Sequence, residues 1–132
     1  MLEENKIVDR AQKVMEILSR QKNMVTTSQI RKFLTAINTV TEKVNAYKLE
    51  NMDKGDTLPI ELQAQIKYLK VKLAYQIGRN KSKWGNPVED FEREAKLMNL
   101  IDSIKNSTKE YEKFAHYMEA LVAFHKFYGG KD

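Results

Sequence analysis

Apolar residues recur at intervals of three and four along most of the chain, which is the period of one face of an α-helix. The pattern predicts five amphipathic helices, each of which buries one stripe of side chains while its other side stays polar. We expect these helices to cover about residues 4–20, 26–47, 59–79, 87–104 and 107–128. No stretch alternates as a half-buried strand does, and no internal repeat is present. The sequence therefore predicts an all-α fold, a compact bundle of about five helices in a single domain spanning residues 1–132.

Residues typical of helix starts support these boundaries. Thr26 with Gln29 fits a capping box, in which the hydroxyl and the amide satisfy free backbone N–H groups. Asn86 before Pro87 is a cap followed by a residue suited to the first helical position. Pro59 is likewise expected in the first turn of the third helix. The two longest expected loops are residues 50–57 and 80–87.

Composition narrows the class of protein further. The 132 residues include five glycines and two prolines, too few for a β-sandwich with many tight turns, and no cysteine. The lack of cysteine excludes disulfides and thiolate metal sites and is typical of a reducing compartment, so we expect a cytoplasmic location. The charged N-terminal stretch lacks the apolar core of a secretion signal. No apolar stretch is long enough to span a bilayer, so no membrane contact is expected.

Positive charge is concentrated in two windows that contain no acidic residue. Residues 17–41 contain Arg20, Lys22, Arg31 and Lys32, and residues 62–88 contain Lys67, Lys70, Lys72, Arg79, Lys81 and Lys83. The windows thus hold ten of the 23 basic residues and none of the 18 acidic ones, so the rest of the chain is net negative. Segregated positive charge is expected of a protein that binds a polyanion, nucleic acid first. Two solvated helix faces that happen to be basic are the simpler interpretation.

The third expected helix is the strongest candidate surface. At 100° per residue its apolar stripe occupies one side, and its cations lie around the rest. Lys72 and Arg79 fall together with Tyr75 beside them, whereas Lys67 lies apart and Lys70 lies at the edge of the apolar stripe. Aromatic rings among cations suit single-stranded or distorted nucleic acid, because bases stack while cations hold phosphates. The alternative is a rim of long basic side chains around a core helix.

Arg31 and Lys32 are expected in the first turn of the second helix. A helix start presents free N–H groups and the positive end of the dipole, so cations there are unfavourable by up to about 1 kcal/mol. Their presence favours a phosphate ligand at this helix start, although random surface composition explains the two residues equally well.

No arrangement typical of catalysis or metal binding is present. His116 and His125 lie nine residues apart, so one helix face cannot bring both to one metal ion, and His125 falls on an apolar stripe and is expected in the core. Carboxylate pairs such as Glu92 and Glu94 lie two residues apart and point to different sides of a helix. No glycine-rich phosphate loop or nucleophile elbow occurs. We expect no catalytic residue, no metal site and no cofactor.

The last expected helix carries more aromatic residues than one helix face can bury. It ends at Gly129 and Gly130, which tolerate the left-handed conformation of a helix end. These aromatic residues are either core with ordinary exposure, or a contact surface for a partner or another copy of the chain. They are Tyr111, Phe114, Tyr117, Phe124, Phe127 and Tyr128.

Three stretches together resemble a known family: TTSQIRKFL (residues 26–34), QIKYLKVKLAYQIGR (65–79) and HYMEALVAFHKFYGGKD (116–132). In this order and in a chain of this length, they are similar to the small subunit of type III-A CRISPR effector complexes, the Csm complexes. The resemblance spans nearly the whole chain and implies an all-helical subunit without nuclease activity of its own. It also implies that several copies stack into a short filament along the channel where guide RNA pairs with target RNA.

On this resemblance the partners of the chain are guide RNA, target RNA, the other subunits of the complex and copies of itself. Contacts with RNA would be mainly to its backbone. The RNA-binding residues that the resemblance implies are Arg31, Lys32, Lys67, Lys70, Lys72 and Arg79. Residues 80–87 lie outside the three stretches, so no role for Lys81, Lys83 or Trp84 follows from it.

The residues alone leave two other classes of protein open. A helical DNA-binding or architectural protein would present base-reading side chains at the exposed start of a recognition helix, and Gln29 and Arg31 could serve there. A protein–protein adaptor would instead use the basic windows to bind an acidic partner.

Overall fold

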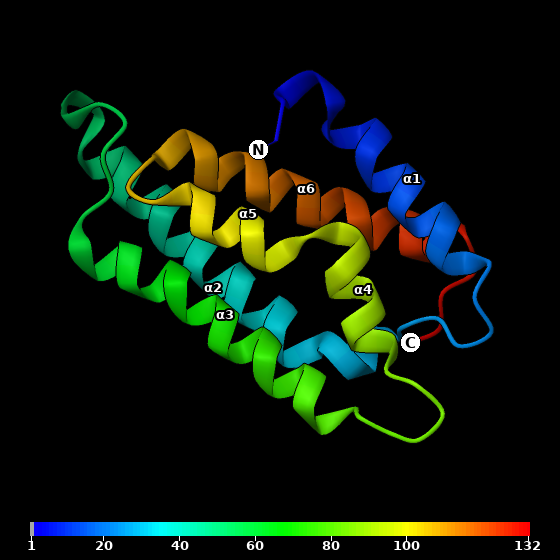
Figure 1. The fold of residues 1–132 in the computed structure, drawn as a ribbon. Helices are drawn as coiled ribbons and strands as arrows, with labels where there is room; N and C mark the ends of the chain where they lie inside the picture. The colour runs from blue at the N-terminus through cyan, green and yellow to red at the C-terminus, as the bar shows by residue number, and fades with distance from the viewer. Residues whose placement is uncertain (1) are drawn as a thin grey trace.

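Six α-helices make up the fold in a computed structural model of the chain, which describes residues 2–132 (Figure 1). They are α1 (Ile7–Ser19), α2 (Thr27–Glu50), α3 (Ile60–Arg79), α4 (Pro87–Ala95), α5 (Leu97–Ile104) and α6 (Thr108–Phe127). Short 3₁₀ turns cover Glu4–Lys6 and Met52–Lys54. No β-sheet occurs among residues 2–132. The predicted all-α bundle is therefore confirmed, and none of the helices in this part of the chain combines the length and apolarity needed to cross a membrane.

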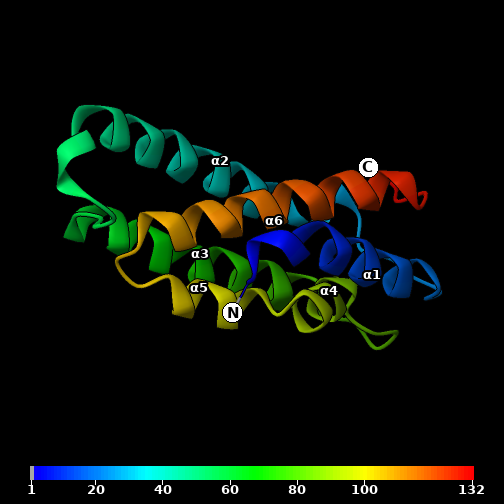
Figure 2. The same ribbon diagram turned by 90° about the horizontal axis from the view of Figure 1, so that it is seen from above.

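The long helices pack in pairs around one apolar core, with α2 antiparallel to α3 and α1 parallel to α6 (Figures 1 and 2). α2 packs against α3, and α1 packs against α6, which runs the length of the bundle (Figures 1 and 2). The short α5 contacts both α3 and α6. The largest fully buried side chains come from the predicted stripes of several helices, so the helical period identified the core. They include Met15, Leu18, Phe33, Ile66, Leu69, Leu73, Phe91, Phe114 and Leu121.

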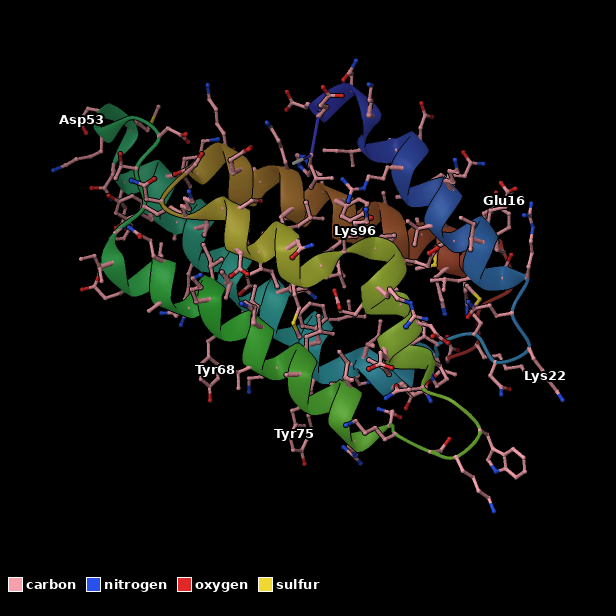
Figure 3. All side chains as sticks on the ribbon, viewed as in Figure 1. Glu16, Lys22, Asp53, Tyr68, Tyr75 and Lys96 are labelled. Atoms are coloured by element: carbon pink, nitrogen blue, oxygen red, sulfur yellow. The ribbon has the colours of Figure 1, made fainter. Side chains whose placement is uncertain are left out.

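The helix predicted for residues 87–104 is two helices, which is the main departure from the expected pattern. Lys96 has φ +58° and ends α4, so α5 leaves in a new direction (Figure 3). The break leaves the Ala95 carbonyl oxygen without a helical partner, and the buried Tyr117 hydroxyl donates to it at 3.0 Å. It also buries both Ala95 and Leu97 completely. Core packing therefore compensates for a left-handed residue that costs about 1–2 kcal/mol.

Helix caps follow the sequence signals with one exception. The Gln29 N–H donates to Thr26 Oγ1 at 3.2 Å, and the Thr26 N–H donates to Gln29 Oε1 at 2.9 Å, so the predicted capping box is confirmed. Asn86 Oδ1 accepts from the Glu89 N–H at 3.1 Å, as expected of a cap. Pro59, however, lies at the N-cap position rather than inside the first turn of α3, because that helix begins at the next residue.

The C-terminal segment crosses the start of α2 and satisfies its backbone. The Thr27 N–H donates to the Lys131 carbonyl oxygen at 3.1 Å, and the Ser28 N–H donates to the Asp132 carbonyl oxygen at 2.6 Å. The first N–H groups of a helix have no hydrogen-bond partner within the helix itself. The start of α2 is therefore closed by the chain itself, and the phosphate ligand suggested by its free N–H groups is not supported.

His125 holds this arrangement together from the core. Its ring is 5% exposed, and Nε2 lies 2.7 Å from the carbonyl oxygen of Val25, which precedes α2. The predicted core position of His125 is confirmed. Gly130 packs directly on the ring, because a Cβ at this position would lie 2.3 Å from His125 Cε1. Position 130 must consequently lack a side chain.

Gly130→Ala should lower the free energy of unfolding by about 1–3 kcal/mol, because the new methyl group overlaps the buried His125 ring. Urea unfolding followed by circular dichroism measures the change. Gly78→Ala is the matched control. Its Cβ meets no atom within 4 Å, and Gly78 lies inside α3, so this change should stabilise the chain by about 0.5–1 kcal/mol. Equal effects of the two substitutions would contradict the close packing at Gly130.

Alkaline pH should lower the stability of the folded chain through the buried Tyr111. Burial raises the pKa of Tyr111 to about 12, against an opposing hydrogen bond from Thr41. Because the folded chain holds this proton more tightly, stability is intact below pH 10.0 and falls by about 1.4 kcal/mol per pH unit above it, until the folded pKa is reached. Urea titrations at several alkaline pH values should show a shallower fall for Tyr111→Phe than for the parent chain. The same fall in both would exclude Tyr111 as a cause.

Candidate nucleic-acid interface

A groove of about 750 Å³ runs between α2 and α3. On α2 it is lined by Arg31, Lys32, Thr35, Ala36, Thr39 and Val40, and on α3 by Ala64, Gln65, Tyr68, Leu69 and Lys72. Alanine and threonine side chains fill little of the space between the two helices, and the apolar atoms of Val40 and Leu69 form a buried floor. Arg31, Lys32 and Lys72 are exposed around the groove. The antiparallel packing of α2 and α3 thus joins cations from both acid-free windows at one site.

Four residues form a row along the outer side of α3: Tyr68, Lys72, Tyr75 and Arg79. We call them the outer row. Their spacings of four, three and four residues keep them on one side of the helix. The two tyrosines are 57% and 61% exposed and point away from the bundle on the same side (Figure 3). Lys72 Nζ lies 5.9 Å from the centre of the Tyr68 ring. The expected neighbourhood of Lys72, Tyr75 and Arg79 is therefore present, and Tyr68 joins it.

Lys67 and Lys70 lie on another side of α3 and face an acid from α5. Lys67 Nζ is 3.0 Å from Asp102 Oδ1, and Lys70 Nζ is 2.9 Å and 3.0 Å from the two carboxylate oxygens. The hydrogen bonds from Lys70 and then Lys67 hold the pKa of the Asp102 carboxyl below its usual value. Lys70 is also half-buried rather than fully solvated. One carboxylate thus neutralises part of the positive charge on this side.

Arg31 and Lys32 lie in the second turn of α2 and not in its first. Both side chains are exposed, so they remain available to a ligand. Asp132 lies near Arg31 and is paired with Lys126 at 3.0 Å. Lys126 first, and Arg31 to a smaller extent, hold the pKa of Asp132 below its usual value. The start of α2 is therefore not a concentration of unopposed positive charge, and the cationic character of the site comes from its side chains.

A second hollow of about 620 Å³ continues beyond the C-terminal end of α3. It brings Lys22, from the loop before α2, close to Arg79 and Lys81. Trp84 lies in the same loop as Lys81 and is 80% exposed, with Lys83 Nζ 5.2 Å from its ring. The two acid-free windows therefore meet here as well as in the groove between α2 and α3.

Tyr68 is the residue of this surface that the sequence analysis missed. The sequence did contain a pattern that would have identified Tyr68. It lies seven residues before Tyr75 and four before Lys72, and these spacings place the three side chains on one helix face. The neighbourhood of Lys22 had no such pattern, since it depends on how two loops meet.

The alternative of a base-reading helix at the start of α2 is weakened by the geometry. The amide oxygen of Gln29 already accepts the Thr26 N–H, and the C-terminal segment covers the start of the helix. A recognition helix would need this end to be open to a DNA groove. Among residues 2–132, no group of three His, Asp or Glu side chains is placed to hold a metal ion.

The aromatic residues of α6 serve mainly the core. Tyr111, Phe114 and Tyr117 are buried, and the rings of Phe124 and Tyr128 are half-buried against them. Phe127 is 73% exposed, which makes it the only strongly exposed aromatic residue of the six. A contact surface built from the whole cluster is therefore not present in this structure.

Comparison with known proteins gives one consistent family. The model of the family described as Csm2 Type III-A matches residues 2–131. A protein of Streptococcus thermophilus named CRISPR system Cms protein Csm2 is 32% identical over 135 residues, covering 100% of this chain and 98% of that protein. The protein of the same name from Enterococcus italicus is 35% identical, covering 93% and 84%. That from Mycobacterium tuberculosis is 31% identical, covering 90% and 89%.

Proposed function

We propose an RNA-contacting, non-catalytic role for this chain, which belongs to the Csm2 family, the small subunit of type III-A CRISPR Csm complexes. In this proposal several copies stack into a short filament inside the effector complex and follow the paired guide and target RNA. The remaining partners are the other subunits of the complex. RNA cutting is left to those subunits, since residues 2–132 show no arrangement of side chains that would activate water or a nucleophile.

The observation that carries the proposal is the joining of both acid-free windows at one surface. Arg31 and Lys32 from α2 line the same groove as Lys72 from α3, and Arg79 follows Lys72 along the outer row. Cations from different helices that surround one groove match the repeated charge of a phosphate backbone. Such contacts carry no sequence information, which suits a subunit that must accept any guide.

The six residues first implied by the resemblance are expected to contribute unequally. Lys67 and Lys70 share the carboxylate of Asp102, so part of their attraction for phosphate is already used within the chain. Among the residues that the structure describes, no acidic one lines the groove that Arg31, Lys32 and Lys72 surround. Arg79 lies in the neighbouring hollow, where Asp90, the one acid described there, is paired with Arg93. We therefore assign the larger share of phosphate binding to these four side chains.

Binding of the full-length chain to a short unstructured RNA should weaken steeply with salt. Four neutralised phosphates give a slope of about −3 for log affinity against log salt, at roughly −0.7 for each single-strand contact. Lys32→Gln with Lys72→Gln should reduce this slope to about half, because two contacts are lost. Fluorescence anisotropy at several KCl concentrations provides the measurement.

Lys67→Gln with Lys70→Gln is the matched control, since it removes the same charge from another side of α3. Its effect on the slope and on affinity should be clearly smaller, because Asp102 already opposes these two lysines. Equal losses in the two double variants would mean that only net charge matters, and a localised RNA surface would be excluded. A salt-independent affinity in the parent chain would exclude phosphate binding altogether.

The purified chain should not cleave RNA or DNA, with or without Mg²⁺ or Mn²⁺. No carboxylate or histidine cluster among residues 2–132 is arranged to bind a catalytic metal ion. Gel analysis of labelled RNA and DNA after long incubation tests this. Cleavage that disappears when a single residue of this chain is substituted would show that the subunit is an enzyme, whereas cleavage that persists in every variant would indicate contamination.

A further inference from the structure

Two tyrosines of the outer row contribute little to the fold. Tyr68 and Tyr75 are 57% and 61% exposed, and Val71 between them is 51% exposed. Aromatic side chains usually bury most of their surface, because burial is their main contribution to stability. Here a continuous aromatic and aliphatic strip is left on the outside of α3. This strip is separate from the core stripe of the same helix, which faces inward and is already complete.

Positive charge surrounds this strip. Lys72 stands between the two tyrosines, with its ammonium group 5.9 Å from the Tyr68 ring, and Arg79 lies one turn beyond Tyr75. Across the groove stand Arg31 and Lys32. The single acid of α3 is Glu61, in the first turn of the helix, about 10 Å along the axis before Tyr68. An occupant must therefore offer both flat apolar faces and repeated negative charge.

We propose that the outer row binds unpaired nucleotides of single-stranded RNA, with bases stacked on Tyr68 and Tyr75 and phosphates held by Lys72, Arg79 and the cations of α2. The inference rests on the proposed function but goes beyond it. Backbone contacts alone would accept paired and unpaired RNA alike, whereas stacking on side chains requires a base whose face is free. The row therefore selects unpaired over paired nucleotides.

The spacing of the row fits a strand. Tyr68 and Tyr75 lie seven residues apart, about 10 Å along the axis of α3. Successive bases of a stacked strand rise about 3.4 Å, so this distance spans about three nucleotides. Lys72 lies between the rings, where the intervening phosphates would pass. Both rings can thus engage the same strand without stretching it.

The groove wall favours RNA over DNA. Thr35 and Gln65 line the groove beside Tyr68, and each brings a polar side chain within the same cavity. A ribose 2′-hydroxyl both donates and accepts hydrogen bonds and is the group that distinguishes the two nucleic acids. The Thr35 hydroxyl and the Gln65 amide N–H groups can pair with it, whereas the Gln65 amide oxygen already accepts from Lys43 at 3.0 Å. DNA strands lack this partner, so they should bind less tightly.

The test compares Tyr68→Leu with Tyr75→Leu against Tyr68→Phe with Tyr75→Phe in the full-length chain. Leucine keeps an apolar side chain suited to a helix but cannot stack, whereas phenylalanine retains the stacking face. The probes are an unstructured RNA carrying 2-aminopurine, the same RNA in a perfect duplex, and a DNA strand of the same sequence. The leucine variant should bind the single-stranded RNA at least about fivefold more weakly and should lose the fluorescence change of the stacked base. The phenylalanine variant should behave as the parent chain does.

Three controls separate stacking from other causes. The slope of log affinity against log salt should be unchanged in the leucine variant, because the substitutions remove no positively charged side chain. Duplex binding should also be unchanged, and Phe127→Leu, which removes an exposed ring from α6, should leave all binding unchanged. Circular dichroism establishes that each variant is folded.

Distinct outcomes overturn the two proposals. If Lys32→Gln with Lys72→Gln weakens binding while the leucine variant binds all probes as the parent does, the phosphate surface stands and base stacking is excluded. If neither variant changes RNA binding, the proposed function itself is lost. Equal affinity for the DNA strand would exclude RNA as the preferred occupant. If the leucine variant loses self-association in sedimentation experiments but keeps RNA binding, the row is a contact between copies of the chain.

Discussion

The packing of α3 against both α2 and α5 decides which of its side chains remain for function. Burial of its apolar stripe, in which Leu69 and Leu73 are almost completely enclosed, fixes the rotation of the helix about its axis. Side chains of this size each contribute about 1.5–3 kcal/mol when buried, whereas exposed ion pairs contribute little. Burial of the apolar stripe therefore determines the rotation of α3, and the ion pairs form where that rotation places the lysines. The rotation turns Lys67 and Lys70 toward Asp102, and it turns the outer row toward solvent.

Helical periodicity predicted most of the fold because each helix buries one continuous stripe. It could not predict the break at Lys96, since neither glycine nor proline marks it. The break is set by tertiary contacts instead, because the Tyr117 hydroxyl, from α6, satisfies the Ala95 carbonyl oxygen. Long-range contacts also placed the C-terminal segment over the start of α2. The glycines at 129 and 130 predicted the end of a helix but not that one of them packs on His125, whose own partner, Val25, is 100 residues away.

In the candidate site, too, the sequence predicted which segments are basic, but not which of their side chains meet in the folded chain. Counting charge along the chain located both basic windows, and packing then brought Arg31 and Lys32 beside Lys72. Residues 62–88 contain no acid along the sequence. In the folded chain, however, an acid from another helix lies beside them. Asp102 lies 32 residues beyond Lys70, and only the contact of α5 with α3 reveals that it opposes two of the four candidate cations on that helix.

Under the proposed function, charge and stacking have different consequences for an assembled filament. Cations in the groove follow a phosphate backbone of any sequence, and exposed rings add a preference for bases that are not paired. A single chain needs only weak affinity for this, because copies held side by side raise the effective concentration of each groove along one strand. Weak individual contacts also let RNA exchange when pairing changes. A site of higher affinity on every copy would hold RNA whether or not the guide had found its target. The exposed outer row therefore suits this role better than a deep pocket would.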